Sequence, residues 1–212
     1  MKMPRSTTTA FSLIELLVVI AIIVVVAGLV VGLNTAATDR KNISRALVER
    51  DRLVTLIENY KSKIGVYPPD NGQTPFDSER NSLFYELAGA VRTTAGPYSP
   101  ADPGYITHFA AIRKSELQTA FGIDGVVNAS DDPTEIKRVL KDVKPDQTNS
   151  VVPNTFSFVV PIDRPVPPAA SLRPNPWQYA TGTNALHNKD SFDLWVEIKV
   201  RGQTRTIGNW KE

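Results

Sequence analysis

The alternation of apolar and polar residues divides the chain after a short polar start. Residues 1–10 are polar and basic, with Lys2 and Arg5 but no acid. From Leu16 to Leu33 no residue carries a polar side chain. As an α-helix this run spans about 27 Å, close to the roughly 30 Å hydrocarbon core of a bilayer. The pattern therefore predicts a polar, basic segment at 1–10 and a transmembrane helix over residues 11–33.

Glu15 is an isolated acid at the front of this apolar run. A carboxylate inside a membrane helix costs a few kcal/mol, so such a residue is interpreted as functional. The alternative is a carboxylate near the helix end that reaches the headgroup region. On the functional interpretation Glu15 needs a positively charged partner.

Two glycines in the run, Gly28 and Gly32, have the GxxxG spacing. Small residues at this spacing let two helices approach closely. Glycine is also common in membrane helices without such a role. Gly28 and Gly32 are therefore candidate helix-packing residues.

An amphipathic continuation of the helix is predicted over residues 34–63. Its apolar residues recur three and four positions apart, at Ile43, Leu47, Leu53, Val54, Ile57 and Tyr60. Gly65 suits the C-terminal cap, and Pro68 follows as a stop. The apolar stripe needs a globular partner, which we expect in a domain formed by residues 64–212.

Residues 92–174 are less regular, and we interpret them as an insertion in that domain. Short helices are predicted at residues 81–90 and 113–121. A further helix is predicted from Asp132, as its N-cap, to Val143. A strand is predicted from Thr155 to Val160.

The C-terminal part has a clear strand pattern. From Phe192 to Val200 apolar and polar residues alternate strictly, as in a half-buried strand. A turn at Arg201-Gly202-Gln203 leads to a returning strand from Thr204 to Ile207. The expected fold class is α+β. Its long N-terminal helix, transmembrane in its first half, packs on a small C-terminal antiparallel sheet.

Composition narrows the function classes. The absence of cysteine excludes disulfides, cysteine-based zinc sites and thiol catalysis. His108 and His187 show no ligand spacing, and no Ser/His/Asp arrangement, phosphate loop or paired-carboxylate site stands out. Lys2 and Arg5 account for the net charge of +2, so the remainder of the chain gives no argument for nucleic-acid binding. We therefore expect a protein that is not an enzyme and has no cofactor.

The segment from Ala10 to Ile23 resembles the prepilin cleavage and methylation signature of type IV pilins and type II secretion pseudopilins. The resemblance implies a pilin-like form of the α+β fold. It also implies that a prepilin peptidase removes residues 1–10 as a leader by cutting between Ala10 and Phe11, and that it methylates the new amine of Phe11. Ala10 replaces the usual glycine. The amine would lie one helical turn from Glu15, or meet Glu15 of a neighbouring subunit, which makes Glu15 an assembly residue.

Three C-terminal motifs resemble the major pseudopilin of type II secretion. They are Asn175-Pro176-Trp177-Gln178-Tyr179, Ser191-Phe192-Asp193-Leu194 and Ile207-Gly208-Asn209-Trp210. The resemblance implies a subunit of a periplasmic filament for protein transport. Its implied partners are copies of itself, other pseudopilins, the inner-membrane secretion platform and membrane lipid. The implied localisation is a single-pass inner-membrane protein with its C-terminal domain in the periplasm.

Members of that family bind calcium in an acidic loop, which the Arg201-Gly202-Gln203 turn replaces here. Side-chain oxygens nearby come from Asn184, Asn188, Asp190 and Asp193. A hard cation accepts such oxygens, and turn formation explains the same residues. Both interpretations stay open, and no metal ligand is assigned.

Four further alternatives remain at this point. The chain is also compatible with a major or minor pilin of a type IV pilus, because the N-terminal motif does not separate the two systems. Residues 92–174 leave room for a membrane-anchored periplasmic enzyme or binding module. The apolar run alone also fits a plain signal anchor, or a secretory signal cut near Thr35-Ala36-Ala37.

Overall fold

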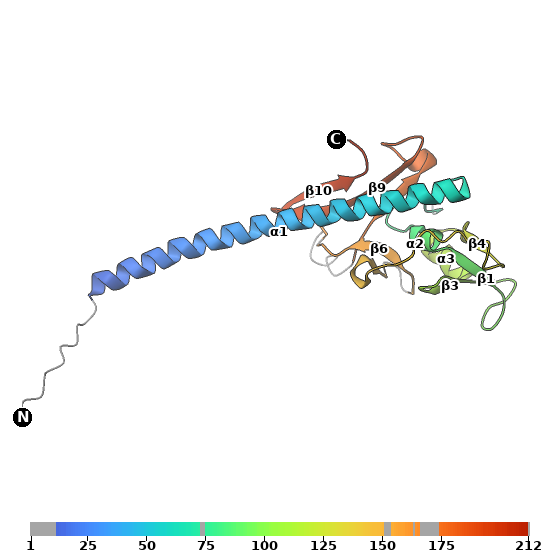
Figure 1. The fold of residues 1–212 in the computed structure, drawn as a ribbon, viewed down its shortest axis with the longest axis horizontal. Helices are drawn as coiled ribbons and strands as arrows, with labels where there is room; N and C mark the ends of the chain where they lie inside the picture. Colours follow the sequence, from blue (N-terminus) through green and yellow to red (C-terminus); the bar gives the residue numbers. More distant parts are fainter. Residues whose placement is uncertain (1–11, 73–74, 151–153, 163, 166–173, 212) are drawn as a thin grey trace, which may run out of the picture. The chain divides into compact units, whose positions relative to one another are not determined.

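The computed structural model describes residues 12–72, 75–150, 154–162, 164–165 and 174–211, without the side chains of residues 29–36. The chain divides into two compact units, Met1–Lys41 and Asn42–Glu212. Helix α1, Leu13–Ile64, begins in the first unit and ends in the second (Figure 1). Each unit is described by itself below.

The second half of α1 forms the centre of the larger unit. Its residues Ala46, Leu53, Ile57 and Tyr60 are fully buried, as their three- and four-residue spacing predicts. The helix ends at Ile64. Gly65 follows with a φ of 95° and donates its N–H to the carbonyl of Lys61 at 2.8 Å, the glycine cap expected from the sequence.

The expected transmembrane first half of α1 is wrong for the part of the chain that the structure describes. Among those residues, no helix combines the length and the apolar character needed to cross a bilayer. The apolar stretch with described side chains, residues 13–28, covers about 24 Å of helix against roughly 30 Å of hydrocarbon. The expected transmembrane and inner-membrane assignments, including the single-pass localisation, are corrected accordingly.

The expected single C-terminal sheet is also wrong. The described residues form an α+β arrangement with three small sheets. They are β3-β2-β1-β4 between residues 90 and 130, β10-β9-β8 between residues 178 and 208, and β5-β6-β7 between residues 148 and 176. The first contains a parallel pair, β1 with β4, so it is not purely antiparallel. The pilin-like fold class is therefore corrected, because strands formed between residues 90 and 160 supply sheets of their own.

The strand bounds are short except in the C-terminal sheet. The first sheet consists of β1 Ala90–Thr93, β2 Gly104–Ile106, β3 Ala111–Arg113 and β4 Ala129–Ser130. The third consists of β5 Thr148–Asn149, β6 Ser157–Val160 and β7 Asn175–Pro176. The C-terminal sheet consists of β8 Gln178–Thr181, β9 Phe192–Val200 and β10 Gln203–Gly208.

The β9–β10 hairpin confirms the strand pair predicted from alternation. Its turn residues Arg201 and Gly202 have φ values of 51° and 78°. Positive φ at both central residues is the backbone geometry that tight hairpins favour.

Two of the three expected short helices form. They are α2, Leu83–Ala88, and α3, Lys114–Phe121. Two 3-10 turns, η1 Pro145–Gln147 and η2 Gly182–Asn184, complete the described elements. Glu116 caps the start of α3, because its side chain accepts a hydrogen bond from the backbone N–H of Arg113 at 2.8 Å.

The helix expected from Asp132 to Val143 does not form. Asp132 does cap a turn, accepting the N–H of Thr134 at 2.8 Å. The following backbone N–H groups then bind distant partners: that of Lys137 donates to the Asn128 side chain, and those of Val139 and Leu140 donate to Leu87. Tertiary contacts therefore replace the helical hydrogen bonds.

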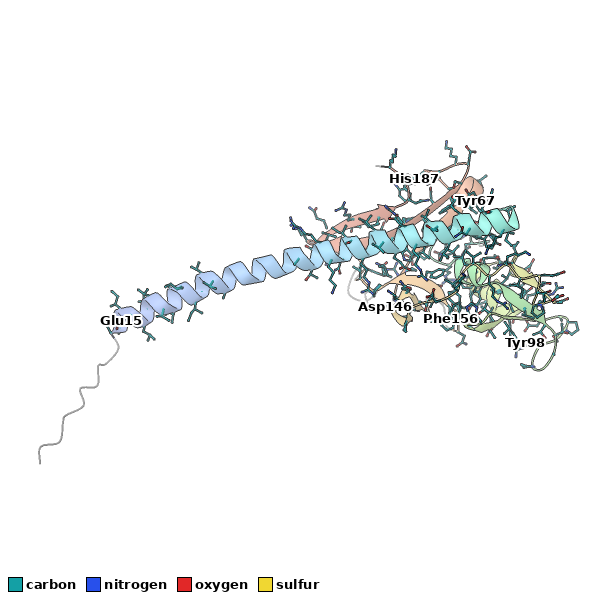
Figure 2. All side chains as sticks on the ribbon, viewed as in Figure 1. Glu15, Tyr67, Tyr98, Asp146, Phe156 and His187 are labelled. Atoms are coloured by element: carbon teal, nitrogen blue, oxygen red, sulfur yellow. The ribbon has the colours of Figure 1, made fainter. Side chains whose placement is uncertain are left out.

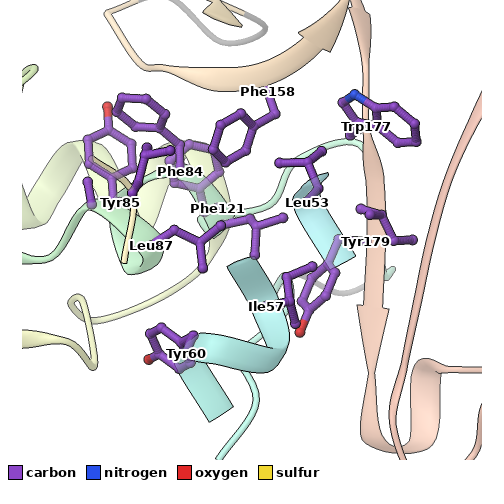
Figure 3. Close-up of a cluster of buried hydrophobic side chains, with 14 of the residues drawn as sticks. Leu53, Ile57, Tyr60, Phe84, Tyr85, Leu87, Phe121, Phe158, Trp177 and Tyr179 are labelled. Atoms are coloured by element: carbon purple, nitrogen blue, oxygen red, sulfur yellow. The ribbon is translucent and has the colours of Figure 1, made fainter. Parts of the chain in front are cut away.

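An aromatic-rich core joins these elements. In Figure 3, Leu53 and Ile57 of α1 lie between Tyr179 of β8 and the side chains of α2, which include Phe84, Tyr85 and Leu87. Fully buried side chains in this view also include Phe84, Leu87, Phe121, Phe158 and Trp177. Burial of each contributes about 1.5–3 kcal/mol. The core holds the second half of α1 between the C-terminal sheet and the elements α2 and β6 (Figure 1).

Candidate functional site

The start of α1 is a capped helix end. The backbone N–H groups of Glu15 and Leu16 donate to the carbonyl of Ser12 at 3.1 and 3.2 Å. In return the Ser12 N–H donates to Oε2 of Glu15 at 2.9 Å. Glu15 thus occupies the third helical position. A carboxylate there forms half of a capping box and interacts favourably with the helix dipole.

This contact is a role for Glu15 that sequence reasoning missed. The signal was present as Ser12-Leu13-Ile14-Glu15, because Ser-x-x-Glu before an apolar run is the capping-box pattern. The contact occupies Oε2; Oε1 has no hydrogen bond among the residues that the structure describes. Capping therefore leaves part of the carboxylate available to a further partner.

The first turns of α1 expose apolar side chains. Figure 2 shows Glu15 at the beginning of the helix with side chains projecting on both sides of the ribbon. Exposure of the large apolar residues from Leu13 to Val26 ranges from 47% at Val19 to 81% at Leu13. A helix that is apolar all round is normally covered, and an apolar surface of this extent marks an interaction site.

The structure places only some of the predicted site residues. The predicted cleavage and methylation residues, Ala10 and Phe11, lie outside the described residues. Gly32 lies in α1, in the stretch 29–36 whose side chains are not described. Gly28 lies on α1, and a Cβ added at this position would meet no other atom within 4 Å. Thirteen residues separate it from Glu15, about 20 Å along the helix, so the two do not meet within one chain.

Asp193 organises the loop before β9. Its buried carboxylate accepts the backbone N–H groups of Leu186, His187 and Asn188 at 2.8, 2.8 and 2.9 Å. It also lies 3.1 Å from Nδ1 of His187. Burial raises the pKa of Asp193, but the N–H donors outweigh burial and hold its pKa below the ordinary value.

Asn184 and Asn188, two of the other candidate calcium residues, also have local partners. Asn188 donates to Asp193 and to the carbonyl of Phe192, each at 3.0 Å. Asn184 donates to Asp70 at 3.1 Å. No group of three or more His, Cys, Asp or Glu side chains that could hold a metal ion occurs among the described residues. These contacts favour the turn-forming interpretation, and calcium stays an untested expectation.

Asn209 fastens the last residues of the chain to β9. Its N–H and Oδ1 pair with the carbonyl and N–H of Leu194 at 3.1 and 2.9 Å, and its side-chain amide donates to Phe192 at 2.9 Å. The side chain thereby acts like an additional strand residue. This gives the Ile207-Gly208-Asn209-Trp210 motif a structural role.

Trp210 lies flat against Gly208 and His187. A Cβ at position 208 would lie 2.7 Å from the Trp210 ring, so only glycine permits this approach. The His187 ring stacks on Trp210 with centroids 3.8 Å apart and planes 5° apart. Trp195 meets Trp210 edge to face at 5.9 Å.

A cavity of about 660 Å³ opens beside these rings. Its lining includes the aromatic residues Phe76, Trp195 and Trp210 and the acids Asp193 and Glu197. No lysine or arginine belongs to its lining in the described part of the chain. The cavity is therefore aromatic and negatively charged.

Glu86 is a buried acid that joins three segments. Its carboxylate accepts the hydroxyl of Tyr60 at 2.8 Å and the N–H groups of Val127 and Asn128 at 2.7 and 3.0 Å. Burial raises the pKa of Glu86 and of Tyr60. The acid therefore connects α1 and α2 to the segment before β4, and its signal was a Glu inside the apolar run Leu83–Ala88.

Comparisons with known proteins give no family for this chain. No family model, no curated protein and no solved structure matches it. The likenesses at residues 10–23 and 175–210 stay resemblances of short motifs. What the chain does is therefore inferred from its own residues and contacts.

Proposed function

We propose that the chain is a structural filament subunit of the pseudopilin kind, which a prepilin peptidase cuts between Ala10 and Phe11 and methylates at Phe11. Copies then assemble, with other pseudopilins, through the first half of α1 into a filament for type II protein secretion. One observation carries the proposal: Glu15 caps the start of α1, and the helix continues as an apolar surface that nothing described in its own unit covers.

The apolar surface supplies the driving force for assembly. Large side chains between Leu13 and Val26 are half or more exposed at most positions. Each such side chain gains about 1.5–3 kcal/mol when it is fully buried. Helix-to-helix packing between copies buries these residues on every side, which packing against one partner surface does not.

Glu15 supplies the register in this proposal. A cut before Phe11 creates a positive amine one helical turn from Glu15, or within reach of Glu15 in the next subunit. Among apolar helices an unpaired carboxylate is costly, whereas a paired one is tolerated. Since capping involves Oε2, the second oxygen is available to the amine.

The experiment is to produce the full chain with and without a prepilin peptidase, together with the variants Glu15→Ala and Glu58→Ala. Mass spectrometry should find a mature chain that starts at methylated Phe11. Electron microscopy should find filaments for the processed wild type and for Glu58→Ala, an acid farther along α1 that contacts Tyr67 at 3.3 Å. Glu15→Ala should be cut but should not assemble.

Three results would overturn the proposal. They are an N-terminus that stays at Met1, one that starts after Ala37, or normal filaments from Glu15→Ala. A type IV pilus pilin is the closest alternative, since it shares the processing and packing steps. The two are distinguished by the neighbouring genes: finding genes for a secretion ATPase and an outer-membrane secretin beside this one would favour the pseudopilin.

A further inference from the structure

The face of β9 that points away from the core carries an acid, Glu197, that has no partner among the described residues. Side chains alternate along a strand, and Leu194, Val196 and Ile198 are fully buried, so Trp195 and Glu197 share the opposite face. Glu197 lies opposite Thr206 of β10 and lines the 660 Å³ cavity. Among the described residues its half-buried carboxylate has no hydrogen bond or ion pair.

The two acids of the cavity differ in availability. Asp193 is saturated by loop N–H groups and by the side chains of His187 and Asn188. Glu197 accepts none of these. The outward residue that follows it, Lys199, does not line the cavity. The cavity therefore contains one accessible negative charge beside an aromatic wall.

The aromatic wall is preorganised. Trp210 stacks on the His187 ring and lies close against Gly208, so packing fixes its position. Its edge-to-face contact with Trp195 supports that ring in turn. Fixed aromatic rings beside a carboxylate suit a cation, because the face of an indole ring attracts positive charge.

We propose that this cavity binds an arginine side chain of a partner polypeptide. The guanidinium group is planar, stacks on aromatic faces and forms paired hydrogen bonds with a carboxylate. Glu197 accepts those hydrogen bonds while the ring of Trp195 contacts the guanidinium plane. The cavity exceeds the volume of one side chain, which leaves room for the residues that flank the arginine. The proposal is independent of filament assembly.

The test is a titration of the full-length chain with the peptide acetyl-Gly-Arg-Gly-amide, followed by tryptophan fluorescence and calorimetry. Acetyl-Gly-Gln-Gly-amide is the neutral control peptide. We expect saturable binding of the arginine peptide that weakens with added salt, and at least about tenfold weaker binding of the glutamine peptide. The lysine peptide should bind more weakly than the arginine peptide.

The protein variants are Glu197→Gln and its matched control Asp190→Asn. Asp190 is exposed, lies on the neighbouring loop and does not line the cavity, so both variants lose one negative charge. Glu197→Gln should weaken binding at least about tenfold without lowering the melting temperature, and Asp190→Asn should bind as the wild type does. Trp195→Leu provides a second variant that should also lose binding.

The proposal fails if the arginine and glutamine peptides bind equally, or if no saturable binding is observed. It also fails if Glu197→Gln binds as tightly as Asp190→Asn. Should Glu197→Gln not fold, unchanged binding by folded Trp195→Leu overturns the proposal.

Discussion

Tyr60 of α1 donates a 2.8 Å hydrogen bond to Glu86 of α2, and both side chains are fully buried. Glu86 in turn accepts two backbone N–H groups from residues 127 and 128. A single carboxylate of α2 thus accepts hydrogen bonds from two segments that are distant in sequence, α1 and residues 127–128. Removal of the carboxylate leaves the Tyr60 hydroxyl and the two backbone N–H groups without this acceptor.

Glu86→Gln should destabilise the larger unit by about 1–3 kcal/mol, because the amide turns one donor toward another N–H or O–H donor. Urea unfolding at neutral pH, monitored by tryptophan fluorescence, measures the change. Glu135→Gln is the control, since Glu135 accepts only the exposed Ser130 hydroxyl among the described contacts. A Glu86→Gln variant as stable as this control contradicts the assigned role.

Asp193 should make stability decline in acid. Its pKa lies below the ordinary value of about 3.9 in the folded chain, so it stabilises the fold above that pH. This contribution is lost as the pH falls through the folded pKa. Asp193→Asn should be less stable at pH 7 and should show a smaller decline between about pH 5 and pH 2. Parallel stability curves for the two proteins would exclude the effect.

Gly208→Ala should displace Trp210, because the added methyl group would lie 2.7 Å from the indole ring. Overpacking of this kind costs about 1–3 kcal/mol. A shift in tryptophan emission and a lower melting temperature are the expected signals. Gly28→Ala is the control, because a Cβ there meets no atom within 4 Å. Unchanged emission in Gly208→Ala contradicts the close approach.

Gly28 should matter for assembly and not for processing. In the proposed filament a large side chain at Gly28 separates the packed helices, whereas the same residue at Ala27 points about 100° away around the helix. Gly28→Leu should be cut normally and yield fewer filaments than Ala27→Leu in electron microscopy. Equal filament yields from both variants would remove Gly28 from the packing surface.

Local patterns predicted the local elements well. Strict alternation identified β9, and the Arg201-Gly202 turn identified its hairpin, because both depend on neighbouring residues. The spacing of Leu53, Ile57 and Tyr60 likewise identified the buried stripe of α1. These features need no knowledge of distant segments.

Long-range contacts account for what sequence reasoning missed. The predicted helix after Asp132 is absent because Asn128 and Leu87 accept its N–H groups. The contact between Tyr60 and Glu86 joins residues 26 positions apart. The cavity depends on Trp195 and Trp210 meeting across a hairpin. No local period encodes such contacts.

The capped start of α1 has one further consequence. Among the described residues, the capping hydrogen bonds at this end join Ser12 to Glu15 and Leu16, and all three residues follow the proposed cut. A peptidase could therefore remove the first ten residues without breaking any of these bonds. Cleavage would then change the charge at the start of a helix that has already formed. The free energy released on polymerisation would not have to offset the cost of folding that helix.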